Sequence, residues 1–181
     1  MYHLTSIRNI GPILTEGLKP RALLQKFEDV ADQEIIANRR SLALENYVPF
    51  HWFARNPFDG RVQANRPGEL FVLITVRRSL AAHRKWKVIP RHPLAAENIQ
   101  LLDYAEGFET IDWEVMNQRD YHDANCKSVC MAECLSPTAV LPSDFFMIYV
   151  FCNDSANYVN RQMVSCGVQV QIAINQKMFS S

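Results

Sequence analysis

The sequence predicts an α+β fold, in which strands and helices occupy separate parts of the chain. Two continuous apolar segments, 70–76 and 145–152, have the length and the β-branched or aromatic content of buried strands. Residues 168–174 alternate apolar and polar side chains, as a half-exposed strand does. With shorter segments the total is about six strands. The chain contains neither a GxGxxG motif nor a P-loop, so nothing indicates a doubly wound nucleotide-binding sheet.

The composition indicates a single globular domain covering residues 1–181. Hydrophobic residues make up 48% and charged residues 21% of the chain, and the 19 basic and 19 acidic residues cancel. Net charge therefore does not indicate a nucleic-acid partner, although a local basic patch is compatible with it. No apolar run is long enough for a membrane span, and the start does not resemble a secretory signal. Five cysteines form no small-domain disulfide framework, so we expect a protein of the reducing cytoplasm.

The N-terminal region predicts a strand followed by a helix. Tyr2–Thr5 forms the strand, Thr5 or Ser6 caps the helix, and Gly17 ends it. The apolar positions of this helix follow helical spacing, namely Ile7, Ile10, Ile13 and Leu14. His3 and Thr5 come directly before the helix, where they could line a ligand pocket. The alternative is a strand-edge histidine that makes only a local hydrogen bond.

Residues 22–44 have a helical pattern, and residues 47–53 are rich in the aromatic and β-branched side chains typical of a strand. Arg55 follows this strand at an Asn-Pro turn signal. An arginine at the end of a buried strand usually has a fixed anionic partner, because the guanidinium group cannot lose its charge. That partner is either a structural carboxylate or a ligand phosphate.

The middle of the chain predicts a polar loop over residues 58–68, a short helical turn at 79–83 and a strand at 85–89. Basic residues concentrate between Arg77 and His92, with Trp86 among them. Such a mixture suits single-stranded nucleic acid, where cations follow the phosphates and rings stack on bases. The alternative is a solvated charged rim.

Glu133 is a single carboxylate inside the apolar segment 129–137, which a proline ends. Burying this charge is costly unless something pairs with it or uses it. On its own the segment equally allows a strand from which Glu133 points to solvent. Residues 111–123 look like a helix followed by a mobile loop ahead of that strand.

Cysteine and histidine recur every four residues at His122, Cys126, Cys130 and Cys134, which suggests a metal site. Four ligands along one helix span about 18 Å, too far for one ion. Structural zinc ligands instead converge from two short knuckles. We therefore expect small buried cysteines and no metal.

Four stretches of the chain, taken in order, resemble the DarT family, the NAD-dependent DNA ADP-ribosyltransferase toxins of bacterial toxin–antitoxin systems. The opening, residues 2–18, resembles the start of the family. Ile35–Arg40 followed by Tyr47–Phe50 resembles the next family segment, whose essential arginine falls on Arg55. The segment 131–135 is similar to the one that carries the catalytic glutamate, Glu133. The chain departs from the family after Arg55, where Asn56-Pro57-Phe58-Asp59 stands and the following loop is short.

The resemblance implies an ADP-ribosyltransferase fold, with two small packed β-sheets around an NAD cleft and peripheral helices. It implies that Glu133 and Arg55 are catalytic, with Arg55 either holding the NAD phosphates or assisting proton removal at the base. The residues expected to bind NAD are His3, Leu4, Thr5, Asn9 and Arg55, and those expected to bind DNA are Arg91, His92 and Lys127. The segment 111–125 would be the loop that recognises the substrate.

The expected activity is transfer of ADP-ribose from NAD to thymine or guanine of single-stranded DNA, which blocks replication and releases nicotinamide. A duplex does not present the reacting atom of a base, so single-stranded or flipped bases are the expected substrates. The implied partner is a cognate antitoxin with ADP-ribosyl-DNA hydrolase activity, and we expect a monomer in the bacterial cytoplasm. The alternatives are an ADP-ribosyltransferase acting on RNA or protein, and a non-enzymatic nucleic-acid-binding module that uses the basic segment 77–92.

Overall fold

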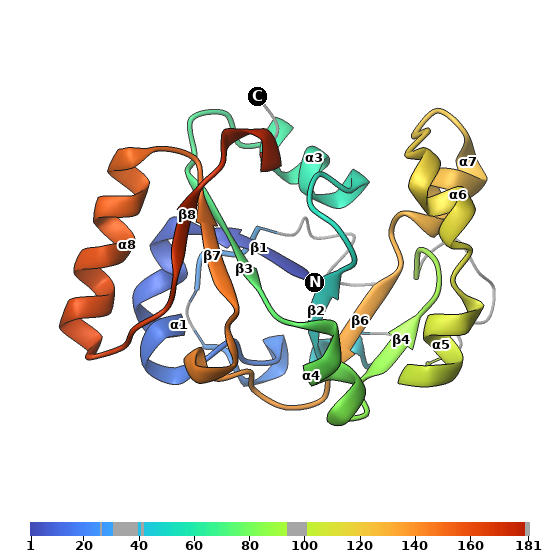
Figure 1. Ribbon diagram of the computed structural model, residues 1–181, viewed down its shortest axis with the longest axis horizontal. Coiled ribbons are helices and arrows are strands. Elements are labelled where there is room, and N and C mark those ends of the chain that lie inside the picture. Colours follow the sequence, from blue (N-terminus) through green and yellow to red (C-terminus); the bar gives the residue numbers. More distant parts are fainter. Residues whose placement is uncertain (26, 31–39, 41, 94–100, 180–181) are drawn as a thin grey trace.

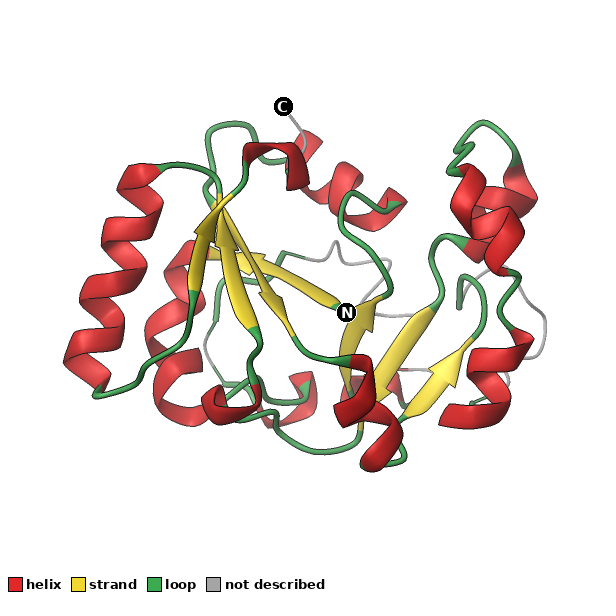
Figure 2. Ribbon diagram, in the orientation of Figure 1, coloured by secondary structure: helices red, strands yellow, loops and turns green. Residues whose placement is uncertain are grey.

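The computed structural model describes residues 1–25, 27–30, 40, 42–93 and 101–179. Within these ranges the chain forms one mixed sheet with helices around it (Figures 1 and 2). The strands are β1 Tyr2–Ser6, β2 Val48–His51, β3 Phe71–Thr75, β4 Lys87–Ile89, β5 Leu102–Asp103, β6 Glu133–Ser136, β7 Met147–Val150 and β8 Ile172–Ile174. The α-helices are α1 Ile10–Glu16, α3 Pro57–Ala64, α4 Arg78–His83, α5 Tyr104–Thr110, α6 Trp113–Gln118, α7 Ala124–Val129 and α8 Asn153–Cys166. Short 3₁₀ turns cover Ile7–Asn9, Arg21–Leu23, Leu44–Asn46, Pro142–Asp144 and Gln176–Met178.

The sheet consists of two halves that meet at a narrow seam. Its order is β5-β4-β6-β2-β1-β3-β7-β8, and every pairing is antiparallel apart from β7 with β8. β1 and β3 pair along five residues, whereas β1 and β2 share the single pair Tyr2 with His51. The two groups of strands diverge from this point (Figure 2). The predicted α+β class is confirmed, and the two expected small sheets are the halves of one sheet.

The half that contains β1 and β3 has an apolar layer on each face. All five residues of β3 are buried, so its side chains pack in both directions. Val72 and Ile74 belong to the main core with residues of α1 and α8, the two helices at the left of Figure 1. Leu73 belongs to a second cluster with Leu4 and with Val62 of α3.

The other half is covered by α5, α6 and α7, at the right of Figure 1. Trp52, directly after β2, contacts an aromatic group from this layer. Its ring centroid lies 5.3 Å from that of Trp113, with the two planes at 88°. Tyr104 and Phe108 also contact Trp52, and the Arg78 guanidinium lies 5.1–5.9 Å from the ring centroids of Trp52, Phe108 and Trp113.

Three sequence-based expectations are wrong in part. Residues 58–68 were expected to form a loop, but α3 occupies Pro57–Ala64, because the Asn56 side chain caps it and proline fits its first turn. The expected helix over 22–44 is absent from the described residues 24–25 and 27–30, while 31–39 lie outside the described residues. The last strand is shorter than expected and begins at Ile172. Among the described helices, none is both long and apolar enough to cross a lipid bilayer.

Candidate active site

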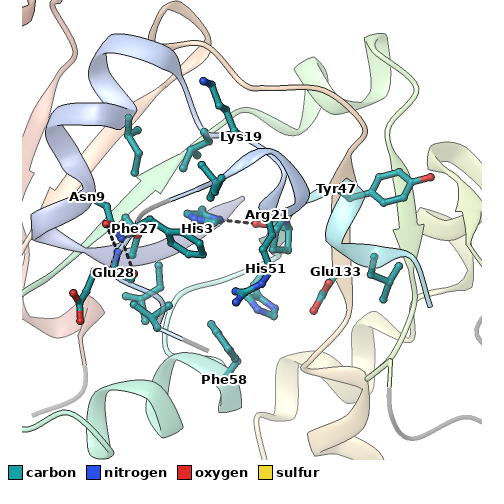
Figure 3. A pocket seen from close by; sticks show the side chains of 18 of the residues that line it. His3, Asn9, Lys19, Arg21, Phe27, Glu28, Tyr47, His51, Phe58 and Glu133 are labelled. Atoms are coloured by element: carbon teal, nitrogen blue, oxygen red, sulfur yellow. Dashed lines mark hydrogen bonds between the residues drawn. The ribbon is translucent and has the colours of Figure 1, made fainter. Parts of the chain in front are cut away.

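A cavity of about 210 Å³ lies against the seam between β1 and β2. One wall comes from β1, α1 and the segment 24–30, of which residues 24–25 and 27–30 are described. The other comes from β2, β6 and the residues after β4 (Figure 3). The predicted site residues that line it are His3, Leu4, Thr5, Asn9, His92 and Glu133. The cavity thus brings together predicted site residues that are distant in the sequence.

Glu133 is the first residue of β6 and has only 5% of its surface exposed. β6 lies between β2 and β4, so Glu133 is paired with His51 on one side and Ile89 on the other. Directly opposed residues of an antiparallel pair project to the same face of a sheet. Glu133 and His51 accordingly both reach the cavity (Figure 3). The alternative of a solvent-facing glutamate is therefore wrong.

Two histidines accompany this carboxylate. The His51 ring is 6% exposed and stacks against Phe58, with centroids 5.5 Å apart. His92 is half-buried, and its backbone N–H donates to the Ser128 carbonyl at 2.8 Å. Burial lowers the pKa of His92, and the nearby cations Lys127 and Arg61 lower it further, whereas Glu133 acts in the opposite direction. The neutral imidazole is therefore the favoured form at neutral pH.

β1 supplies polar groups to the facing wall. His3 donates from Nδ1 to the Pro49 carbonyl at 2.8 Å. This bond crosses from β1 to β2 close to the seam (Figure 3). The Thr5 hydroxyl accepts a hydrogen bond from Asn9 Nδ2 at 3.0 Å. The His3 ring and the Thr5 hydroxyl thus have fixed directions in the cavity wall.

Asn9 acts as a clamp on the segment 24–30. Its Nδ2 donates to the Glu28 carbonyl at 2.8 Å, and its Oδ1 accepts from the Glu28 N–H at the same distance (Figure 3). This segment contributes Leu24, Phe27 and Val30 to the cavity wall. The amide of Asn9 is engaged by the protein itself, so Asn9 shapes the cavity by holding an irregular segment in place.

Arg55 lies outside the cavity lining, in the turn of residues 52–56 between β2 and α3, which we call the Arg55 turn. It is exposed and has a φ of 60°, in the left-handed region. Its backbone N–H donates to Asp59 Oδ2 at 3.0 Å, and its carbonyl accepts from the Tyr121 hydroxyl at 2.8 Å. The Arg55 turn therefore joins α3 to the chain between α6 and α7.

The segment 111–125 is more regular than expected. It contains α6, a turn and the start of α7. Arg91 precedes His92 and is exposed, and Lys127 is exposed on α7. Arg119 stacks over Phe53 in the Arg55 turn, with the guanidinium carbon 4.3 Å from the ring centroid. Of these cations, Lys127 lies near enough to His92 of the cavity wall to influence its pKa.

The basic segment 77–92 is largely engaged within the protein. Arg84 forms a bidentate ion pair with Asp144 at 2.7 and 2.8 Å, and Lys87 pairs with Asp103 at 2.6 Å. Trp86 is 1% exposed and stacks on Phe50, so it cannot stack on a base. These contacts argue against a binding module built on this segment.

The cysteines serve as packing residues. Cys126, Cys130 and Cys134 are each at most 1% exposed, and burial raises the pKa of Cys130 and of Cys134 to about 12. Within the described ranges, no group of three or more His, Cys, Asp or Glu side chains is arranged to hold a metal ion.

The sequence patterns did not single out His51, Asp59 or the segment 24–30 as parts of this region, and they included Tyr121 only within the broader segment 111–125. The period-two alternation of β2 could have placed His51, because it predicts which strand residues share a face. The Asn56-Pro57 start with Asp59 three residues after the cap could have revealed α3. Tyr121 and the segment 24–30 reach the site through tertiary contacts that no local pattern encodes.

The chain matches one family model and several solved structures. The family model described as "ssDNA thymidine ADP-ribosyltransferase, DarT" matches residues 2–180. The structure of Thermus sp. 2.9 DarT in complex with ADP-ribosylated ssDNA matches with a TM-score of 0.83 and 18% identity, covering 99% of this chain and 95% of that one. The structure of the same DarT in complex with NAD+ matches with a TM-score of 0.80 and 18% identity, covering 99% of this chain and 96% of that one. The structure of Thermosipho africanus DarTG in complex with ADP-ribose matches with a TM-score of 0.76 and 19% identity, covering 98% of this chain and 50% of that one.

No protein of curated function gives a significant match. The family match spans nearly the whole chain, and it confirms the resemblance found in the sequence together with the expected NAD-dependent DNA ADP-ribosyltransferase activity. The structural matches confirm the expected fold. This chain therefore belongs to the DarT family of ssDNA thymidine ADP-ribosyltransferases.

Proposed function

We propose that this chain transfers ADP-ribose from NAD+ to thymine in single-stranded DNA, with Glu133 as the catalytic carboxylate. The observation that carries this assignment is the burial of Glu133 at the wall of a cavity whose facing wall holds His3 and Thr5. The family description favours thymine over guanine, which the sequence left open.

The chemistry needs a carboxylate at this place. The bond between the ribose C1′ and nicotinamide breaks, the electron pair leaves with nicotinamide, and the sugar gains oxocarbenium character. A carboxylate beside the sugar stabilises that positive charge. A ring nitrogen of the base then bonds to C1′ and loses its proton, which Glu133 can accept. His51 and His92 are placed around the carboxylate, where their rings exclude water and restrict its direction.

We assign each of the remaining site residues either to NAD+ or to DNA. His3 and Thr5 hold the nicotinamide side of NAD+, and Leu4 and Asn9 shape the cavity beside them. Arg55 acts on the DNA side, since it lies outside the cavity lining and contacts the chain between α6 and α7. We assign Lys127, Arg91 and His92 to the DNA backbone, because Arg91 and Lys127 are exposed cations and Lys127 and Glu133 both lie near His92.

The biological setting follows from the proposed substrate. Single-stranded DNA is exposed at replication in the bacterial cytoplasm, so we place the protein there, as a monomer. The DarTG match supports pairing with an antitoxin. A hydrolase that removes ADP-ribose from DNA would be the matching antitoxin activity, because it reverses the lesion rather than blocking the enzyme.

The decisive experiment incubates the protein with NAD+ and single-stranded oligonucleotides that differ in one base type, read by mass spectrometry. We expect one ADP-ribose added only where thymine is present, with release of nicotinamide. Glu133→Gln should lower transfer by at least about a hundredfold, the usual scale for losing a group that acts in the transition state. Transfer that persists in Glu133→Gln would remove Glu133 from its role, and modification of guanine alone would overturn the assigned base.

A further inference from the structure

We infer that Asp59 and Tyr121 are positioning residues that fix Arg55 for its role in transfer to DNA. Each forms a hydrogen bond with the backbone of Arg55, one at the N–H and one at the carbonyl. This inference rests on the proposed function of the site. Neither residue needs to contact NAD+ or DNA. They act through the conformation of the Arg55 turn.

The first observation is the unfavourable backbone conformation of Arg55. Its φ of 60° lies in the left-handed region, which costs a side-chain-bearing residue about 1–2 kcal/mol. Such a conformation persists only where the surroundings impose it. If the restraint were lost, Arg55 would return to a negative φ and its side chain would project in another direction.

The second observation is a buried carboxylate that supplies this restraint. Asp59 is 1% exposed, and its Oδ2 accepts from the backbone N–H of Arg55 at 3.0 Å. The Asp59 N–H donates in turn to Asn56 Oδ1 at 3.0 Å, so the start of α3 and the Arg55 turn are tied reciprocally. Asp59 Oδ1 is buried and has no hydrogen-bond partner among the described residues. Burying a carboxyl group is costly unless its oxygens are hydrogen-bonded, and the bond from the Arg55 N–H offsets part of that cost.

The third observation is an independent hydrogen bond to the Arg55 backbone, from the segment that precedes Glu133. The Tyr121 hydroxyl donates to the Arg55 carbonyl at 2.8 Å. Burial raises the pKa of Tyr121, so the hydroxyl keeps its proton and remains a donor at neutral pH. Arg119, two residues earlier, stacks on Phe53 in the same turn. The peptide groups on both sides of the Arg55 Cα are thus fixed by residues from different elements.

The test compares Asp59→Ala, Asp59→Asn and Tyr121→Phe in the ADP-ribosylation of a thymine-containing oligonucleotide. Asp59→Ala and Tyr121→Phe should each lower kcat by about tenfold, the equivalent of one lost hydrogen bond to a fixed group. The KM for NAD+ should stay close to the wild-type value, because Arg55 lies outside the cavity lining. Asp59→Asn should retain most of the activity, because its amide oxygen can still accept from the Arg55 N–H.

Val62→Ala is the matched control. Val62 is buried on the same helix but belongs to the cluster with Leu4 and Leu73, so its truncation destabilises α3 without touching Arg55. It should lower the unfolding temperature and leave kcat unchanged for folded protein. Wild-type kcat in folded Asp59→Ala would overturn the inference, because Asp59 would then serve only as a helix cap.

Amide hydrogen exchange of Arg55, followed by NMR, provides a readout that needs no substrate. Asp59→Ala should speed exchange of the Arg55 amide selectively, whereas Val62→Ala should affect α3 as a whole. Unchanged exchange in Asp59→Ala would also overturn the inference. If the wild type modified no oligonucleotide, the proposed function would fail. Selectively fast exchange of the Arg55 amide in Asp59→Ala would then still show that Asp59 restrains the Arg55 backbone.

Discussion

Asp59 and Asn9 are polar side chains whose hydrogen bonds go to the protein backbone, and each fixes a different part of the site. Asp59 holds the backbone of Arg55, and Asn9 holds that of Glu28. Glu133 differs from both because its carboxylate faces the cavity. The carboxylate that faces the cavity thus comes from one residue, while the backbone around the site is held by hydrogen bonds from other side chains.

The buried Asp59 makes the stability of the protein depend on pH. Burial raises its pKa from 3.8 to about 7. Between these two values the folded protein binds more protons than the unfolded chain, so the free energy of unfolding falls as the pH rises from about 4 to about 7. At about 1.4 kcal/mol per pKa unit, the loss is a few kcal/mol.

Asp59→Asn should remove this component, so that its free energy of unfolding falls less than that of the wild type over the same pH interval. Urea denaturation at several pH values measures the difference. If the free energy of unfolding changed equally with pH in the two proteins, Asp59 would not titrate in this interval.

Loss of the Asn9 clamp should weaken NAD+ binding more than it slows chemistry. Asn9→Ala removes both hydrogen bonds to Glu28, so the segment 24–30 no longer holds its place in the cavity wall. We expect the KM for NAD+ to rise by about tenfold or more, since each net hydrogen bond contributes about 1 kcal/mol. Nicotinamide release measures this. Thr15→Ala is the control, because Thr15 is exposed and its hydroxyl donates to Gly11 within α1; an equal effect there would contradict the clamp.

At the scale of elements, β2, the Arg55 turn and α3 form the unit that connects the cavity to the chain between α6 and α7. β2 carries His51 to the cavity, and the turn places Arg55 outside it. α3 begins immediately afterwards, with Pro57 in its first turn and Asn56 as its cap. A stable start to α3 is therefore a condition for a defined Arg55 turn.

Asn56→Ala should destabilise the protein by about 1–2 kcal/mol, at the upper end for a helix cap. Asn56 is 1% exposed, and besides accepting from Asp59 it donates from Nδ2 to the Phe53 carbonyl at 3.2 Å. Asp112→Ala, at the exposed cap of α6 where Asp112 accepts from Val115, should cost less. Chemical denaturation of both variants measures their free energies of unfolding. A larger decrease in Asp112→Ala than in Asn56→Ala would contradict this expectation.

At the scale of the whole molecule, the sheet is continuous in hydrogen bonding but nearly divided at the seam. One residue pair joins β1 to β2, and the His3–Pro49 bond adds a side-chain link. The cavity lies over this junction and takes its walls from both halves. A ligand that fills it contacts both halves at once.

NAD+ should therefore slow amide exchange on both sides of the seam, in β1 and in β6, while α8 changes little. At a free concentration about a hundred times its dissociation constant, binding adds about 2.7 kcal/mol to the free energy of unfolding. Hydrogen exchange with mass spectrometry maps the effect. Protection confined to one half of the sheet would show that NAD+ binds elsewhere.

The sequence predicted the strands that bury both faces and the helices with clear ends, because burial and capping leave local patterns. β3 and the helix ending at Gly17 are examples, and Gly17 has the expected positive φ of 83°. It failed at α3, where charged and glycine residues hide a helix that its cap and tertiary packing stabilise.

For the site, the order of motifs predicts Glu133, His3 and Thr5, and all three line one cavity in the structure. The sequence could not place Arg55 relative to that cavity, because its position depends on a left-handed turn held by Asp59 and Tyr121. It also could not show that the basic segment 77–92 is engaged by Asp103 and Asp144, since both partners are distant in the chain.

The perpendicular contact between Trp52 and Trp113 gives the molecule a built-in optical signal. Trp52 opens the Arg55 turn and Trp113 begins α6, and two indoles 5.3 Å apart couple their electronic transitions. Such coupling produces a paired circular-dichroism band that depends on the angle between the rings. Any rearrangement of the Arg55 turn against α6, whether caused by DNA or by a substitution, should change this band without an added label.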